Sequence, residues 1–135
     1  MMRMIALPIA LALAAPLSAQ GFTAPNDLSV AAMSGDRFEV IEASGIGATG
    51  LWCAAGAYAH SALQAPDNAQ LYVVSARAES QAAAGRKAVT YALNPEDTAP
   101  RPAVILLMST YTPGSFLSVG HARTLCSYAR SPGGR

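Results

Sequence analysis

Two cysteines, Cys53 and Cys126, are the only thiol-bearing residues of the 135-residue chain. A thiolate near a helix N-terminus, where Cys53 is expected, could be a nucleophile, but no second cysteine lies three residues away to complete a C-x-x-C redox pair. An even cysteine count in an exported chain instead predicts a structural disulfide, because the periplasm and the cell exterior are oxidising. The bond would close a loop of 73 residues and stabilise the domain by about 4 kcal/mol.

His60 and His121 are the only histidines, and they are the candidate acid–base groups. His60 follows Cys53 by two helical turns, a spacing that would suit a thiol and base or two metal ligands. A disulfide at Cys53 would remove the sulfur from both arrangements, and a third ligand is missing. His121 follows a glycine, and we expect it in a solvated hairpin turn. We therefore predict no metal and no catalytic residue, and keep as the alternative a small periplasmic enzyme using His60 or His121 with a carboxylate.

Other motifs with chemical potential are weaker. Gly45-x-Gly47-x-x-Gly50 matches the dinucleotide-binding string. The acidic residue expected at the end of the next strand, about 20 residues on, is misplaced, because Asp67 lies before that strand and Glu79 lies too far beyond, and no βαβ series follows. We therefore predict a flexible connector and no cofactor. A G-x-S-x-G elbow is absent. We expect the paired carboxylates to be solvated; these are Glu39 with Glu42, and Glu96-Asp97.

The aromatic residues could build a core or line a ligand groove. We expect Trp52 and Tyr91 in the core, and the groove remains open as an alternative for Tyr58, Tyr72 and Tyr111.

The N-terminal segment predicts export. Arg3 precedes an uncharged apolar run that is too short to span a bilayer, and Leu17-Ser18-Ala19 fits a signal-peptidase site before Gln20. Residues 1–19 are therefore expected to be a removable signal peptide, cleaved between Ala19 and Gln20. No cysteine near the site could carry a lipid, so we predict a soluble protein that is periplasmic or secreted.

Charge narrows the class of partner. Only Arg3 of the nine basic residues lies in the leader, which leaves basic and acidic residues balanced at eight each. Nucleic-acid binding and attachment to a membrane need a clustered basic excess, so neither is expected. The adjacent pair Arg86-Lys87 follows a glycine and is interpreted as a solvated hairpin end.

Hydrophobic periodicity predicts an α+β domain over residues 20–130 with a flexible tail at 131–135. We expect one main helix over 51–64, capped by Thr49, with a narrow apolar face led by Trp52. The helix should pack on a largely antiparallel sheet of five or six strands, stapled by the disulfide. The expected strands are 28–33 and 37–42 around a turn at Ser34-Gly35-Asp36, then 71–79, 87–94, a central strand at 103–110, and, after a turn at 111–114, a terminal hairpin of 115–119 and 123–129.

Two short motifs carry a resemblance. The segment L-W-C-A-A-G-A-Y-A at 51–59 and R-T-L-C-S-Y at 123–128 are similar to small uncharacterised exported proteins of alphaproteobacteria, which pair a W-C-(A or G)-A-x-x-Y-A helix with a late cysteine. The resemblance implies export and the fold, and it implies no mechanism. We thus expect a non-catalytic binding or accessory protein of the cell envelope, whose partner is an unknown protein or small ligand.

Overall fold

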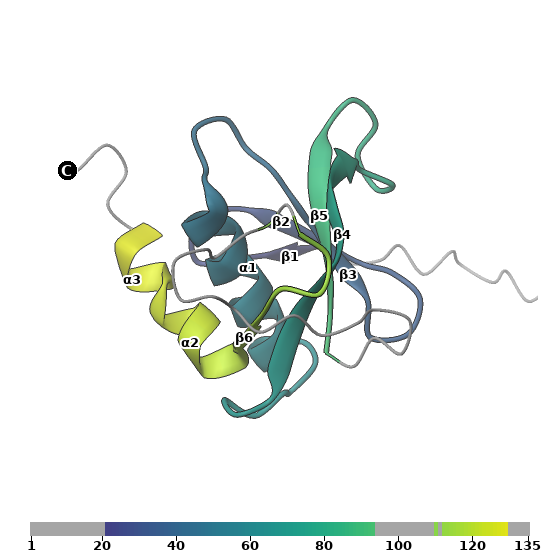
Figure 1. Ribbon diagram of the computed structural model, residues 1–135. Coiled ribbons are helices and arrows are strands. Elements are labelled where there is room, and N and C mark those ends of the chain that lie inside the picture. Colours follow the sequence, from purple (N-terminus) through teal and green to yellow (C-terminus); the bar gives the residue numbers. More distant parts are fainter. Residues whose placement is uncertain (1–20, 94–109, 111, 130–135) are drawn as a thin grey trace, which may run out of the picture.

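The computed structural model describes residues 21–93, 110 and 112–129 (Figure 1). Six strands form one antiparallel sheet in the order β1-β2-β3-β5-β4-β6, and the helices lie to one side of it. The α+β class, the main helix and the antiparallel sheet predicted from the sequence are confirmed. The elements are β1 (Phe22–Thr23), β2 (Ser29–Ala32), β3 (Phe38–Ile41), α1 (Ala48–Ser61), β4 (Gln70–Glu79), β5 (Lys87–Ala92), β6 (Phe116–Ser118), α2 (Val119–Thr124) and α3 (Cys126–Ala129).

The β2–β3 hairpin forms where the turn residues predict it. Gly35 has φ +67°, a conformation that glycine adopts without a steric penalty, and Ala32 pairs with Phe38 on either side of the turn. Phe38 and Val40 are both fully buried. Alternation along a strand places both on the face toward the helices.

The centre of the sheet continues this buried face. Phe38 lies opposite Tyr91 and Val40 opposite Val89, so β3 and β5 present one apolar surface to α1. The pairing of β5 with β4 is less regular, because two register shifts, between Val73 and Ser75 and between Ser75 and Ala78, insert extra residues into β4. Such bulges bend and twist a strand. The far end of the β4–β5 hairpin is therefore bent relative to the rest of the sheet.

Helix α1 differs from its prediction in its start and in its faces. It begins at Ala48, and Gly47 is the N-cap residue without a side-chain hydrogen bond, so the expected cap at Thr49 is wrong. Every residue from Gly50 to Ala59 is buried. The sheet covers one side of α1, and α2 with α3 cover the other, which gives three layers (Figure 1). The expected narrow apolar face is thus replaced by a helix that is buried all round.

The C-terminal hairpin predicted from the sequence is also wrong in its second half. Strand β6 forms, but Ser118 then caps α2, its side chain accepting a hydrogen bond from the backbone N–H of His121 at 3.1 Å. The preceding turn is as predicted, since Ser115 N–H donates to Thr112 and Gly114 has φ +91°. The strand expected at 103–110 lies outside the described residues except for Thr110, which is buried in a bend.

None of the helices in the described part of the chain has the length and apolar character needed to cross a membrane.

Candidate functional site

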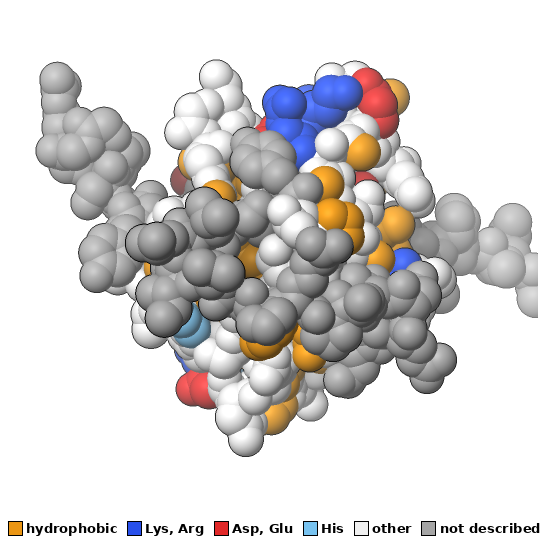
Figure 2. All heavy atoms as spheres, in the orientation of Figure 1, with side chains coloured by type: hydrophobic (Ala, Val, Ile, Leu, Met, Phe, Trp, Pro, Cys, Tyr) orange, Lys and Arg blue, Asp and Glu red, His pale blue; other side chains and the backbone are white. Residues whose placement is uncertain are grey.

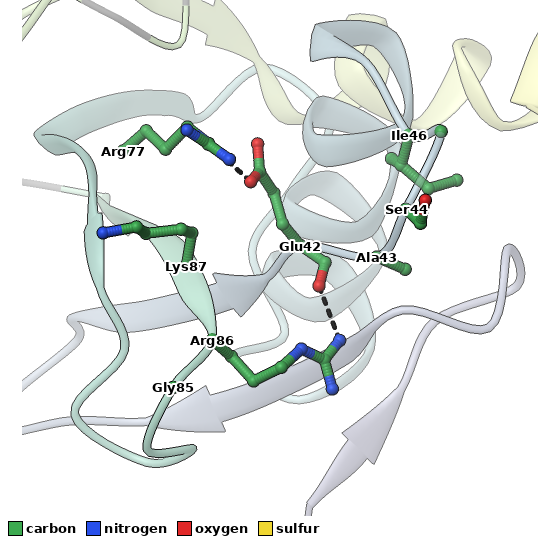
Figure 3. A pocket seen from close by; sticks show the side chains of 9 residues that line it. Glu42, Ala43, Ser44, Ile46, Arg77, Gly85, Arg86 and Lys87 are labelled. Atoms are coloured by element: carbon green, nitrogen blue, oxygen red, sulfur yellow. Dashed lines mark hydrogen bonds and ion pairs between the residues drawn. The ribbon is translucent and has the colours of Figure 1, made fainter.

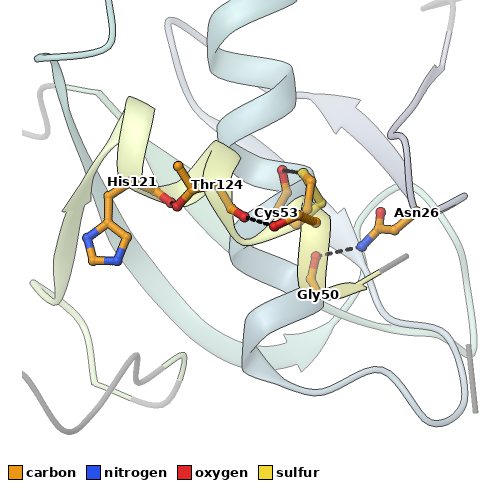
Figure 4. Close-up of a disulfide and its surroundings, with 7 residues drawn as sticks. Asn26, Gly50, Cys53, His121 and Thr124 are labelled. Carbon is orange, nitrogen blue, oxygen red and sulfur yellow. Dashed lines mark hydrogen bonds between the residues drawn. A yellow bond between two sulfur atoms is a disulfide. The ribbon is translucent and has the colours of Figure 1, made fainter. Parts of the chain in front are cut away.

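The predicted disulfide between Cys53 and Cys126 is present (Figure 4). It joins the buried first half of α1 to the start of α3, with 4.8 Å between the Cα atoms. The bond was expected to staple the helix to a strand, and it joins two helices because the C-terminal segment is helical. Both sulfurs are committed to the cross-link, so neither is available as a nucleophile or a metal ligand in this state.

The structure does not bring the histidines together with an acid–base partner. His60 is exposed in the last turn of α1, and His121 is exposed in α2 rather than in a hairpin turn, pointing away from the disulfide in Figure 4. Asp67, next to α2, pairs with Arg123 at 2.8 Å. Within residues 21–93 and 112–129, no group of three His, Cys, Asp or Glu side chains could hold a metal ion.

The glycine string connects β3 to α1. Gly45 lies in the loop with φ +81°, and Gly47 precedes the first turn of α1. Gly50 is packed under Ile46, whose Cγ2 would lie 2.5 Å from an added Cβ, and its carbonyl accepts a hydrogen bond from Asn26 at 2.9 Å. These roles are structural, and the antiparallel sheet lacks the βαβ unit in which this string holds a pyrophosphate.

The described aromatic residues mainly build the core. Trp52 and Tyr91 are buried, as predicted, with ring centroids 5.1 Å apart in an edge-to-face arrangement. Tyr58 packs against Phe38, with 4.4 Å between the ring centroids. Burial raises the pKa of the Tyr91 hydroxyl well above its ordinary value, and that of Tyr58 to a lesser degree. Tyr72 is half-buried at the β4–β6 pairing, and Tyr111 lies outside the described residues.

Glu39 contradicts the expectation of a solvated carboxylate. It is only 2% exposed in the middle of β3, and its carboxylate accepts three hydrogen bonds from the end of the β4–β5 hairpin. The donors are the Ser80 hydroxyl at 2.5 Å, the Gln81 N–H at 3.1 Å and the Ala82 N–H at 2.9 Å. The Ser80 hydroxyl oxygen also accepts from the N–H groups of Ala82 and Ala83. We call this arrangement the Glu39 latch, because it fixes the hairpin end to the sheet.

Glu42 is also paired rather than solvated. Its carboxylate contacts Arg77 Nε at 2.5 Å, and its backbone carbonyl accepts a hydrogen bond from Arg86 Nη2 at 2.6 Å (Figure 3). The other predicted acidic pair, Glu96-Asp97, lies outside the described residues.

These contacts line a hollow of about 350 Å³ between the β3–α1 loop and the β4–β5 hairpin. In Figure 2, Lys and Arg side chains gather at the same end of the molecule, beside the tip of that hairpin. Lys87 on its rim pairs with Glu79 at 3.4 Å. We call the hollow the cationic pocket; it is lined by Glu42, Ala43, Ser44, Gly45, Ile46, Arg77, Gly85, Arg86 and Lys87.

Sequence reasoning missed the composition of this pocket. The pair Arg86-Lys87 lies at a hairpin end as predicted, but Arg77 joins it from the other strand of the hairpin, and Glu42 from the loop after β3. The only local signal was the basic pair itself. The convergence depends on the bulges in β4, which no residue pattern announces.

Comparison of the chain with protein-family models, with curated proteins and with solved structures gave no match. The predicted cleavage site, Ala19 and Gln20, lies outside the described residues.

Proposed function

We propose that this chain is an exported, non-catalytic binding or accessory protein of the cell envelope, which acts in the periplasm or outside the cell after a leader of residues 1–19 is removed. The observation that carries the proposal is the disulfide between Cys53 and Cys126. Such cross-links form and persist in oxidising compartments and are rare in the cytosol. The signal-peptide pattern at the N-terminus supports the same route.

Binding is favoured over catalysis by the way the polar side chains are used. The Glu39 latch and the Glu42–Arg77 and Asp67–Arg123 pairs commit their carboxylates to structural contacts. The exposed His60 has no hydrogen-bonded carboxylate among the described residues, and neither has His121. An acid–base mechanism requires such groups within hydrogen-bond reach of one substrate.

The export part of the proposal is tested by fractionating bacteria that express the full chain with a C-terminal tag. We expect the protein in the envelope or the medium, with Gln20 as its first residue and no thiol that reacts with maleimide until reductant is added. A variant with Ala19→Arg should retain its leader and serves as the control for processing. Recovery of the unprocessed chain from the cytosol, or of two reactive thiols from envelope material, would contradict the proposal.

The binding part is tested by capture from envelope extract on the immobilised oxidised protein. A partner or ligand should be retained by the native protein and lost after unfolding. A variant with both histidines changed, His60→Ala with His121→Ala, should retain capture, whereas a turnover activity that this variant abolishes would favour the enzyme.

A further inference from the structure

We infer that the cationic pocket binds a small ligand through its carboxylate or phosphate oxygens. The inference rests on the proposed function as a binding protein, and it adds the site and the chemical class of ligand. Three segments that are distant in sequence supply the walls: the loop after β3, Arg77 on β4, and the turn that begins β5 (Figure 3). Its volume of about 350 Å³ lies in the range of small-molecule sites.

Charge is concentrated at this pocket. Among the described residues, the lining contains three of the nine basic residues of the chain, Arg77, Arg86 and Lys87, and one carboxylate, that of Glu42. The chain as a whole has a formal charge of only +1, so this excess is local. Concave sites lined by one sign of charge attract ligands of the opposite sign.

The pocket also has more hydrogen-bond donors than its protein acceptors use. Arg86 donates through Nη2 to the Glu42 carbonyl, and its Nε and Nη1 have no partner among the described residues. Lys87 has three ammonium protons, and its one contact within the described part of the chain, with the exposed Glu79, is long at 3.4 Å. A ligand that brings only acceptor oxygens complements this set, because guanidinium and ammonium groups form charge-assisted hydrogen bonds with carboxylates and phosphates.

The walls are built in advance of any ligand. The Glu39 latch holds the hairpin end from which Arg86 and Lys87 project, and the Ser80 N–H donates to the Arg86 carbonyl at 2.8 Å. Gly45 and Gly85 border the pocket with φ of +81° and +80°, and the positions their side chains would occupy are open space. Preorganised donors bind more tightly because less conformational entropy is lost on binding.

The test is calorimetric titration of the purified oxidised protein at low salt. The probes are inorganic phosphate and succinate, which separate phosphate from carboxylate recognition, with choline as the cationic control. We expect saturable binding of at least one anion and none of choline, weakened by added salt. Binding of phosphate alone or of succinate alone assigns the ligand group, and either supports the inference.

The variant is Arg86→Gln with Lys87→Gln, and the matched control is Arg123→Gln, which removes a partly exposed arginine paired with Asp67 outside the pocket. Anion affinity should fall about tenfold or more in the first and remain unchanged in the second. Thermal unfolding of each variant verifies the fold, and Lys87→Gln alone replaces the double variant if that protein is unfolded.

Absence of saturable binding of both anions, or equal weakening by Arg123→Gln, would overturn the inference. If neither anion binds and the protein still captures an envelope partner, the inference fails while the proposed binding function stands.

Discussion

Substitution of Glu39 by alanine should lower the free energy of unfolding by about 3 kcal/mol. Three hydrogen bonds end on this carboxylate, at 2.5, 3.1 and 2.9 Å from their donors on Ser80, Gln81 and Ala82. Each bond should contribute about 1 kcal/mol net, which is less than many hydrogen bonds to charged groups contribute. The reason is that the hairpin end is exposed, so water can hydrogen-bond to part of the donors that lose the carboxylate. The desolvation cost of burying the carboxylate offsets the remaining strength of these charge-assisted hydrogen bonds.

The assay is urea unfolding followed by circular dichroism, combined with amide hydrogen exchange. Glu39→Gln retains one acceptor oxygen and should lose roughly half as much as Glu39→Ala. The control Glu79→Gln removes an exposed carboxylate that faces Lys87, and it should change stability by less than about 0.5 kcal/mol. Exchange at the Gln81 and Ala82 amides should accelerate in Glu39→Ala.

The reasoning is refuted if Glu39→Ala is as stable as the unsubstituted protein or more stable. In that case the desolvation of the carboxylate would outweigh its three bonds, as happens for some buried ion pairs.

Three further perturbations probe the rest of the fold. Reduction of the disulfide should lower the free energy of unfolding by about 4 kcal/mol, which is the chain-entropy value for a loop of 73 residues. Urea titration with and without reductant measures this change. A change below about 1 kcal/mol would contradict the prediction. Gly56→Ala should lower the free energy of unfolding by about 1–3 kcal/mol in the same titration, because the new Cβ would lie 2.7 Å from the Cβ of Ala122. Gly21→Ala, whose Cβ meets open space, is the control. Equal effects of the two substitutions would exclude close helix packing as the cause. Burial raises the folded-state pKa of Tyr91, so the contribution of this residue to stability is complete below about pH 10 and is lost as the pH rises through the folded-state pKa. The Tm should therefore decline at alkaline pH, and Tyr91→Phe should make that decline smaller. An unchanged decline would show that other groups cause it.

The parts of the fold that the sequence predicted correctly depend on local periodicity and on residue counts. Alternation of apolar residues identified β3 and β5, and turn-forming residues identified the β2–β3 hairpin. The disulfide followed from an even cysteine count in a chain expected to be exported, which requires no knowledge of the fold.

The errors arose where contacts between distant segments decide the structure. The C-terminal segment was assigned to a strand because α2 has only six residues, too few to show a helical period, and its Ser118 cap was overlooked. The all-round burial of α1 depends on α2 and α3, and Gly56, which has no side chain, lets α2 approach α1 closely. Gly56 meets Ala122, which follows it by 66 residues, and a pattern within α1 cannot reveal so distant a partner.

The candidate site was the least predictable part for the same reason. Glu39 resembles any strand carboxylate until the hairpin end, 41 residues later, supplies its donors. Arg77, which joins the basic pair in the pocket, lies in the part of β4 between Ser75 and Ala78 where the register against β5 shifts. Sequence composition indicated equal numbers of acidic and basic residues outside the expected leader. Only the fold shows that the basic residues are unevenly distributed over the surface.

The disulfide and the Glu39 latch connect different layers of the domain. We therefore expect their loss to have different effects on the stability of the fold and on the geometry of the pocket. The disulfide joins α1 to α3, and neither Cys53 nor Cys126 lines the pocket. The Glu39 latch joins β3 to the end of the β4–β5 hairpin, and that hairpin supplies the three cations of the pocket, Arg77, Arg86 and Lys87. Loss of the disulfide therefore stabilises unfolded states relative to the native one without moving Arg86 or Lys87 in the molecules that remain folded, whereas loss of the latch releases the very segment that positions them. On this argument the disulfide contributes to the stability of the folded domain, and Glu39 determines how well the cationic pocket is formed.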